Sequence, residues 1–264
     1  MPPTLPSPLE GFDTLRRRLR GRTPLLCLDF DGTLTEIVDH PDDARLAPDT
    51  RELLARLSTR CPVALISGRA LDDLRTRVDL PALYYAGNHG LEITGPAGSG
   101  LSFRGRAAGD GLRRAAERLR VEAERFPGLY VEDKGMTLSV HYRQVATVQR
   151  AAVAAAVQRA VADAPELSLR GGKAVHEIRP AGSTHKGTAL SWLMDRIAGA
   201  YPHLHAVSIG DDLTDEDAFA AVAGRGEAIL VGAPRPTAAN WRLEDPAQVH
   251  ELLSRLDHEL RTEA

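Results

Sequence analysis

Short apolar runs alternate with helix-like segments at both ends of the chain, and this alternation limits the possible folds more than any other feature of the sequence. An apolar run of about four to eight residues has the length of a buried strand, whereas apolar residues every three to four positions are typical of a helix. Strands and helices in strict alternation predict β-α units on a parallel sheet. The expected strands are 25–28, 63–66, 83–86, 204–209 and 228–231, and the expected helices are 48–60, 71–78, 187–200, 214–222 and 246–261.

The middle of the chain has a different pattern. A glycine-rich turn at 95–100 lies between two strand-like pieces and predicts a hairpin, and a long helix is expected next. Two strands, an alanine-rich helix and two more strands follow, which is an antiparallel α+β order. We therefore predict an α/β fold with a doubly wound, Rossmann-like parallel-sheet core, residues 1–104 and 182–264, and an inserted α+β cap domain, residues 105–181. The expected elements here are strands 91–94, 101–103, 129–132, 137–142, 167–169 and 174–178 and helices 107–125 and 145–163.

The composition of the whole chain excludes several classes of protein. Its 43% hydrophobic and 26% charged residues are ordinary for a globular protein, and a net charge of -3 provides no basic surface for nucleic acid. No apolar run approaches the ~20 residues of a membrane helix, and Met1-Pro2-Pro3 does not begin a secretory signal. We therefore expect a cytoplasmic protein with no nucleic-acid or membrane partner. The working expectation for its assembly is a monomer, although the sequence does not reveal the oligomeric state. Cys27 and Cys61 lie in or beside apolar runs and are expected to be buried thiols.

Two aspartates, Asp29 and Asp31, follow the expected strand 25–28 directly. In an open parallel sheet, ligands bind beyond the carboxyl ends of the strands. A spacing of two places both carboxylates on one side of an extended backbone, and Gly32 permits a sharp turn after them. Because two carboxylates this close repel each other, they require a cation or a shared proton at neutral pH. A helix cap followed by a turn would explain only one of the two aspartates.

A second acidic cluster follows the expected strand 204–209 and contains Asp211, Asp212 and Asp215. Carboxylate oxygens suit Mg²⁺, which a few carboxylates bind while phosphate and water complete its octahedron. The part from Thr214 onward is equally a helix N-cap with an acidic first turn. Asp211 and Asp212 precede that cap, so they are the better indication of a metal site.

Two further segments provide groups for phosphate. The expected strand 63–66 ends in Ser67, Gly68 and Arg69, which would present a hydroxyl and backbone amides at a helix N-terminus, although the same residues also suit ordinary capping. Lys186 begins an expected helix, where the helix dipole disfavours a lysine. A buried ammonium there could neutralise both a phosphate and a nucleophile, which predicts a chemical role for this lysine.

In this order, the four segments resemble the motifs of the haloacid dehalogenase superfamily of phosphohydrolases. The resemblance implies that Asp29 attacks phosphorus and becomes an aspartyl phosphate. Asp31 would first protonate the leaving group and then activate the hydrolytic water. Ser67, Gly68 and Lys186 would bind the phosphate oxygens.

The same resemblance implies a Mg²⁺ cofactor. Its ligands would be Asp29, the backbone carbonyl of Asp31, and Asp211. Asp212 and Asp215 would be auxiliary acids that do not bind the metal directly. Chemically, this is covalent catalysis with neutralisation of a charged transition state by a metal ion.

Four segments outside these motifs resemble the trehalose-6-phosphate phosphatases within that superfamily. They are Ala86–Glu92, Glu132–Gly135, Ser139–Arg143 and Gly172–Pro180. The insert also lies where this superfamily carries its type 2 (C2B-like) cap. The resemblance implies a small-molecule substrate, trehalose 6-phosphate, which is hydrolysed to trehalose and phosphate in trehalose biosynthesis.

Four charged side chains of the insert suit a sugar, because hydroxyl groups donate and accept hydrogen bonds at once. Lys134 and Lys173 are two of only three lysines among 33 basic residues, and a lysine provides a compact charge where arginine provides a planar fork. A Glu–Lys pair on a strand can also be a solvated surface, and a histidine beside glycine can bond its own backbone. The expected substrate-binding residues are Arg69, Asn88, His89, Glu132, Lys134, Lys173 and Glu177.

Two alternative functions are compatible with the sequence. A phosphatase of the same fold that acts on sucrose phosphate, a glycosylglycerate phosphate or another sugar phosphate, or a phosphomutase, would share the core motifs. A non-catalytic sugar-phosphate sensor would share the fold but would not need a nucleophile. The presence of Asp29 and Asp31 together with Lys186 and Asp211 favours an enzyme.

Overall fold

A computed structural model of the chain describes residues 5–182 and 184–262. The parts of the expected core at 1–4, 183 and 263–264, including Met1-Pro2-Pro3, lie outside the described residues. The chain divides into two compact units. Unit 1 consists of Met1–Phe103 and His185–Ala264, and unit 2 consists of Arg104–Thr184.

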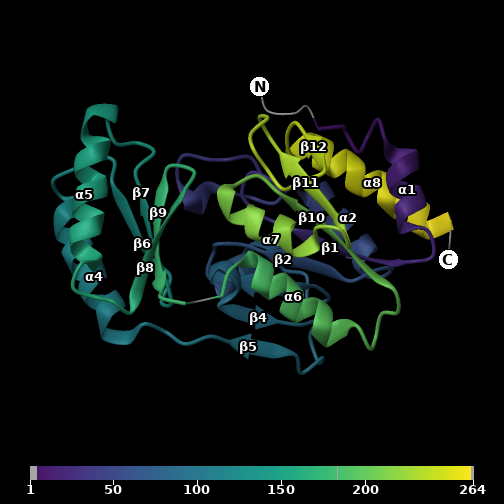
Figure 1. The fold of residues 1–264 in the computed structure, drawn as a ribbon, viewed down its shortest axis with the longest axis horizontal. Coiled ribbons are helices and arrows are strands. Elements are labelled where there is room, and N and C mark those ends of the chain that lie inside the picture. Colours follow the sequence, from purple (N-terminus) through teal and green to yellow (C-terminus); the bar gives the residue numbers. More distant parts are fainter. Residues whose placement is uncertain (1–4, 183, 263–264) are drawn as a thin grey trace. The chain divides into compact units, whose positions relative to one another are not determined.

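Unit 1 is built on an eight-stranded sheet with the order β12-β11-β10-β1-β2-β3-β4-β5 (Figure 1). Neighbouring strands from β12 to β3 pair in parallel, and β4 pairs with β3 in the antiparallel direction. This is the predicted α/β fold. The strands are β1 (Thr23–Leu28), β2 (Val63–Ile66), β3 (Tyr84–Gly87), β4 (Glu92–Thr94), β5 (Ser102–Arg104), β10 (Leu204–Gly210), β11 (Glu227–Val231) and β12 (Trp241–Leu243).

Helices cover both faces of this sheet, because successive side chains of a strand point to opposite faces. Leu26 and Leu28 of β1 pack in the cluster that also holds the buried leucines of α1, α2, α3 and α8, whereas Leu25 and Cys27 pack with α6 and α7. Both cysteines are buried free thiols, as expected. The helices are α1 (Phe12–Leu19), α2 (Pro48–Ser58), α3 (Leu71–Val78), α6 (Lys186–Ile197), α7 (Glu216–Val222) and α8 (Pro246–Thr262).

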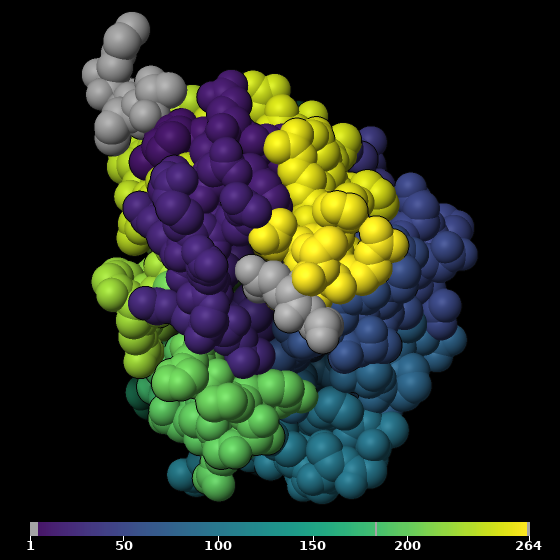
Figure 2. Space-filling model, turned by 90° about the vertical axis from the view of Figure 1, so that its right-hand side faces the viewer, coloured from purple at the N-terminus to yellow at the C-terminus, as the bar shows by residue number. Residues whose placement is uncertain are grey.

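The N-terminal helix α1 lies beside the C-terminal helix α8 (Figures 1 and 2). Arg16 of α1 forms an ion pair with Glu259 of α8 at 3.5 Å, and Arg255 of α8 donates to the carbonyl of Leu9 at 2.8 Å. These contacts join segments from the two ends of the chain.

Unit 2 is a four-stranded antiparallel sheet with the order β6-β7-β9-β8. Its helices, α4 (Gly109–Ala123) and α5 (Arg150–Val161), pack on the sheet through a separate apolar cluster that includes Leu119, Val157 and Ile178. The strands are β6 (Tyr130–Asp133), β7 (Leu138–His141), β8 (Leu167–Gly172) and β9 (Val175–Pro180).

The differences from the sequence prediction include strand β12 and helix α5. Strand β12 was not predicted, because three residues are too short to produce an apolar run. The helix expected from residue 145 begins as an α-helix only at Arg150, after the 3₁₀ turn Thr147–Gln149. Among the helices of the described residues, none combines the length and apolar character that crossing a bilayer requires.

A buried carboxylate, Glu227, fastens α1 to the sheet. Its oxygens accept hydrogen bonds from Trp241 and Asn240 at 2.7 Å and from Arg18 at 2.9 Å, and His205 lies 3.4 Å away. Burial raises the pKa of Glu227, but His205, the hydrogen bonds from Trp241 and Asn240, and the charge of Arg18 outweigh burial and lower the pKa from 4.5 to about 2. Arg18 therefore has a structural partner on the sheet.

We predict that this carboxylate stabilises the fold at neutral pH and ceases to do so in acid. Because its folded-state pKa is lowered, the unfolded chain binds the proton first, so the stabilisation is complete above pH 4.5 and is lost as the pH falls toward 2. The contribution is on the order of 3 kcal/mol. Urea unfolding of wild type and Glu227→Gln should show a stability difference that shrinks from neutral pH down to about 3. A difference independent of pH would contradict the assignment.

Candidate active site

The predicted core residues follow four neighbouring strands at the carboxyl edge of the parallel sheet. Leu28 at the end of β1 pairs with Ile209 of β10 on one side and Leu65 of β2 on the other. Asp29 and Asp211 therefore emerge at the same edge, and the segment after β2 emerges next to them. The sheet brings together residues that are far apart in sequence, as the β-α pattern predicts.

Lys186 lies between two carboxylates at this edge. Its Nζ is 2.9 Å from Asp29 Oδ1 and 2.7 Å from Asp215 Oδ1. The lysine is 2% exposed, and the two aspartates are 7% and 3% exposed. Helix α6 begins at this lysine, which points its side chain back to the edge of the sheet. An ammonium buried this deeply is stable only beside compensating charge.

The electrostatics of the three groups are mutually dependent. Burial lowers the pKa of Lys186, but the two carboxylates outweigh burial and raise it well above its usual range, so the ammonium stays charged. Burial raises the pKa of Asp29, and Asp215 and Asp211 raise it further, while Lys186 lowers it. Burial likewise raises the pKa of Asp215. One ammonium is therefore insufficient to keep all the acids ionised.

Three aspartates at this edge have the chemistry of a divalent-metal site. Asp29, Asp211 and Asp215 each offer a carboxylate oxygen, and these oxygens all lie within 4.8 Å of one another. All three residues are buried. Three negative charges against the single ammonium of Lys186 leave a surplus that a divalent cation would neutralise, and hard oxygen donors suit Mg²⁺. Asp215, expected as an auxiliary acid, belongs to this group geometrically.

The carboxylate of Asp31 is bound by a different partner. Both of its oxygens accept from the Arg69 guanidinium, at 2.8 Å from Nε and 2.6 Å from Nη2. Arg69 is 5% exposed and also donates to Asp73 at 2.9 Å and to the carbonyl of Pro41 at 2.8 Å. Such a bidentate pair orients a carboxylate firmly. The structure thus places Arg69, expected at the substrate, against Asp31.

A short 3₁₀ turn, Asn88–Gly90, supports the Ser67 segment. Asn88 and His89 both have positive φ, a conformation that costs non-glycine residues energy. In return, the amide of Asn88 donates to the Arg69 carbonyl at 2.7 Å and the amide of His89 donates to the Ser67 carbonyl at 2.9 Å. A side chain on Gly68 would meet the ring of His89, so this turn packs directly on the expected phosphate loop.

The start of α7 differs from the sequence prediction. Asp212, not Thr214, caps the 3₁₀ turn Leu213–Asp215, and its amide donates to Asp215 Oδ2 at 3.0 Å. Asp215 therefore links the cap to Lys186. The expectation that the cap lies at Thr214 is wrong, because Thr214 lies inside this 3₁₀ turn and α7 begins after it, with Asp215 as its N-cap residue.

In unit 2, three of the four expected sugar-binding side chains lie together. Lys134 Nζ is 3.6 Å from Glu132 and 3.8 Å from Glu177, and its side chain is 6% exposed. Ser139 donates to Glu177 at 2.7 Å, and His141 lies 2.9 Å from Glu132, so both belong to the group although neither was predicted. The sequence could have indicated Ser139 and His141, because along β7 they alternate with the core residues Leu138 and Val140. The fourth, Lys173, is exposed in the turn between β8 and β9.

The fold of the chain is that of the haloacid dehalogenase-like proteins. The structure matches a haloacid dehalogenase-like hydrolase from Bacteroides thetaiotaomicron with a TM-score of 0.61 and 16% identity, over 89% of this chain and 100% of that one. Within this class, the chain belongs to the trehalose-phosphatase family, whose model matches residues 27–247. It is therefore a phosphatase.

Two relatives show how far the similarity extends. The chain is 42% identical over 264 aligned residues to the trehalose-phosphate phosphatase of Mycobacterium tuberculosis, and the match covers 97% of this chain and 67% of that protein. The C-terminal domain of C. albicans trehalose-6-phosphate phosphatase matches with a TM-score of 0.79 and 24% identity, over 97% of this chain and 98% of that chain. The second match concerns the fold alone.

We predict that Gly32 is required for activity because of its contact with Asp211. An added Cβ at Gly32 would overlap the Asp211 carboxylate, and φ is +80° there. Gly98 has the same φ but nothing within 4 Å of an added Cβ, which makes it a matched control. Gly32→Ala and Gly98→Ala should each lose ~1 kcal/mol of stability, whereas only Gly32→Ala should lose about 100-fold in phosphate release. Comparable activity of the two variants would contradict this prediction.

Proposed function

We propose that the chain hydrolyses trehalose 6-phosphate to trehalose and phosphate through an aspartyl phosphate on Asp29. The observation that carries the proposal is the buried Asp29 carboxylate, held 2.9 Å from Lys186 at the carboxyl edge of the sheet. Family membership and the names of the mycobacterial relatives support the substrate.

The chemistry has two displacements at phosphorus. An oxygen of Asp29 attacks, the bond between phosphorus and the sugar oxygen breaks, and Asp31 donates a proton to the departing sugar. Water then loses a proton to Asp31 and attacks the same phosphorus, which breaks the bond to Asp29 and releases phosphate. Asp31 ends in the protonation state in which it began. Throughout, the ammonium of Lys186 offsets the charge on Asp29 and on the phosphoryl oxygens.

The proposed Mg²⁺ would be held by Asp29, the backbone carbonyl of Asp31, and Asp211. When bound, Mg²⁺ supplies Lewis-acid neutralisation of the phosphoryl oxygens. Asp215 adds negative charge close to these ligands, which keeps Lys186 protonated. Ser67 and the backbone of Gly68 would bind further phosphate oxygens at the carboxyl end of β2.

Unit 2 is proposed to recognise the sugar. Lys134, Glu132 and Glu177 form a compact group with both donors and acceptors, which suits adjacent hydroxyls. Lys173 would contribute a further ammonium from the turn between β8 and β9. Asn88 and His89 of unit 1 are proposed to contact the substrate or to support the phosphate loop that does so.

The substrate proposal is tested by phosphate release from a panel of sugar phosphates. Trehalose 6-phosphate should give the highest kcat/KM, ahead of sucrose phosphate and a glycosylglycerate phosphate, and chelation should abolish the activity until Mg²⁺ is restored. Asp29→Asn should lose about 1,000-fold or more, with mass spectrometry to exclude deamidation of the new side chain. If the enzyme prefers another sugar phosphate, the proposed substrate is wrong but the proposed mechanism still holds. An active Asp29→Asn would refute the mechanism itself.

We also predict that Arg69 acts by orienting Asp31. A lysine cannot reproduce the bidentate contact, so Arg69→Lys should misplace the proton donor. An alkyl phosphate with a poor leaving group needs that proton, whereas an activated aryl phosphate does not. Arg69→Lys should therefore lower kcat for the sugar phosphate by about 10- to 100-fold and for an aryl phosphate much less.

Arg77 provides the matched control. It bonds the same Asp73 carboxylate as Arg69, at 2.8 Å, but has no bond to Asp31 among the described residues. Arg77→Lys should leave the ratio of the two substrates' rates unchanged. If Arg69→Lys slowed both substrates equally, Arg69 would serve phosphate binding or folding, and not the orientation of Asp31.

A further inference from the structure

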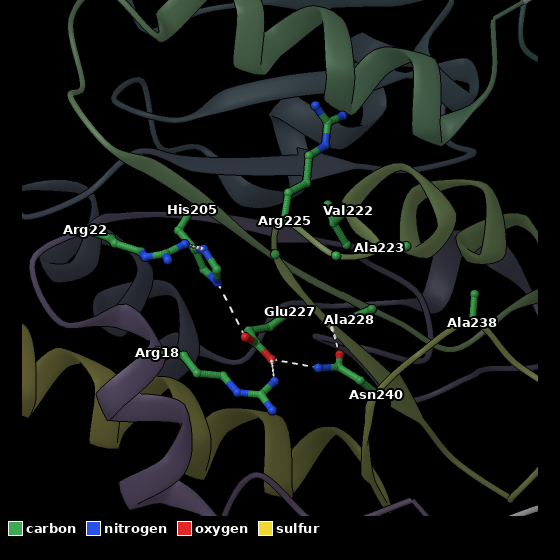
Figure 3. A pocket seen from close by; sticks show the side chains of 12 residues that line it. Arg18, Arg22, His205, Val222, Ala223, Arg225, Glu227, Ala228, Ala238 and Asn240 are labelled. Atoms are coloured by element: carbon green, nitrogen blue, oxygen red, sulfur yellow. Dashed lines mark hydrogen bonds and ion pairs between the residues drawn. The ribbon is translucent and has the colours of Figure 1, made fainter.

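Unit 1 has a cavity of about 390 Å³ at the amino ends of β10 and β11 (Figure 3). Its polar lining includes Arg18, Arg22, His205, Arg225, Glu227 and Asn240. His205 lies near the start of β10, whereas Asp211 follows the end of the same strand. At ~3.3 Å per residue, the two ends are roughly 20 Å apart. The cavity is therefore distinct from the catalytic cluster.

The single carboxylate of this cavity is fully engaged. Glu227 binds Trp241, Asn240 and Arg18 through Oε2 and faces His205 through Oε1. Its side chain is 3% exposed. It therefore neutralises Arg18 and has little capacity to neutralise further arginines.

The histidine of the cavity, His205, bonds Arg22 through its ring. Nδ1 of His205 lies 2.7 Å from Nη1 of Arg22, and a guanidinium can only donate, so Nδ1 accepts. The ring proton then resides on Nε2, which faces Glu227. His205 thereby holds the guanidinium of Arg22 beside its own ring, as Figure 3 shows.

Two arginines of the lining have only neutral partners. Among the described residues, Arg22 bonds His205, and Arg225 bonds the carbonyl of Ala221 at 2.9 Å and Ser191 Oγ at 3.4 Å. Neither forms an ion pair with a carboxylate in the described part of the chain. With Glu227 offset by Arg18, Arg22 and Arg225 add two further positive charges around the cavity. The guanidinium of Arg22 lies against His205, whereas that of Arg225 extends toward Ser191 (Figure 3).

We propose that this cavity is a second anion site, which binds a small molecule carrying a phosphate group. A dianionic phosphate matches the two further charges, and the guanidinium fork matches its oxygens. At ~30 Å³ per water, the volume equals roughly 13 water molecules, which leaves room for a monosaccharide-sized group as well as the phosphate. The source of the phosphate is either free inorganic phosphate or a phosphorylated metabolite. The site does not depend on the proposed hydrolysis.

Tryptophan fluorescence can observe this site directly. The chain has two tryptophans, and Trp241 lies under the guanidinium of Arg18, 5.5 Å from its ring centre, and bonds Glu227. Replacing the other, Trp192→Phe, leaves Trp241 as the sole reporter. This protein is titrated with inorganic phosphate and with glucose 6-phosphate, with sodium chloride at matched ionic strength as the screening control.

Saturable changes in Trp241 emission are expected with at least one phosphate probe and not with chloride. Tighter binding of glucose 6-phosphate would identify a phosphorylated metabolite, and equal affinities would identify free phosphate. Arg22→Gln and, separately, Arg225→Gln should each weaken binding by about tenfold or more. The matched control is Arg17→Gln, which removes an exposed arginine of α1 that bonds Thr14 and does not line the cavity.

Two results would overturn the proposal. One is the lack of any saturable response to either phosphate probe up to about 10 mM. The other is an equal affinity of Arg22→Gln, Arg225→Gln and Arg17→Gln, because binding would then occur elsewhere, for example at the catalytic cluster. Using two independent variants guards against loss of fold in either one, which thermal unfolding would reveal.

Discussion

The ion pair between the Lys186 ammonium and the Asp29 carboxylate is the interaction on which the rest of the site depends. Both groups are almost completely removed from water, so each would be costly without the other. Asp215 completes the arrangement on the far side of the ammonium. The lysine therefore holds together the end of β1, the start of α6 and the turn before α7. Of these segments, β1 is paired with the strand that leads into the turn before α7, whereas the start of α6 reaches the edge of the sheet through the lysine.

This constraint also explains why bulky residues are excluded nearby. A Cβ at Gly210 would collide with the Asp215 carboxylate, and one at Gly187 would collide with the carbonyl of Asp217. Helix α6 must therefore approach α7 closely for its first side chain to reach the sheet. The apolar contacts of Leu190 and Phe219 in the same layer hold the two helices at that distance. The apolar packing between α6 and α7 thus fixes the distances between the charged side chains at the site.

The fold was predictable because long buried strands leave a strong pattern, but several side-chain partners were not. The expected strand 204–209 coincides closely with β10, and Lys186 begins α6 as expected. The direct bond between Asp215 and Lys186 was missed, because the sequence shows which side chains can cap a helix but not which rotamer they adopt. The Arg69 contact with Asp31 was missed for a similar reason. Arg69 was expected at the substrate because it follows Ser67 and Gly68 in the expected phosphate loop, whereas its guanidinium reaches across to Asp31, which follows the neighbouring strand β1.

The pairing of β1 with β10 has a consequence for the synthesis of the chain. The end of β1 at Leu28 and the start of β10 at Leu204 are 176 residues apart. At ~5–20 residues per second, a ribosome takes roughly 10 to 35 seconds to produce the missing neighbour. During that interval, one edge of β1, the strand on which Asp29 is carried, has no partner and is open to pairing with other nascent chains. A circular permutant that joins the two ends of the chain and begins between α6 and β10 would place β10 ahead of β1 in the order of synthesis. It would shorten this exposed stage while keeping every strand pairing of the finished sheet.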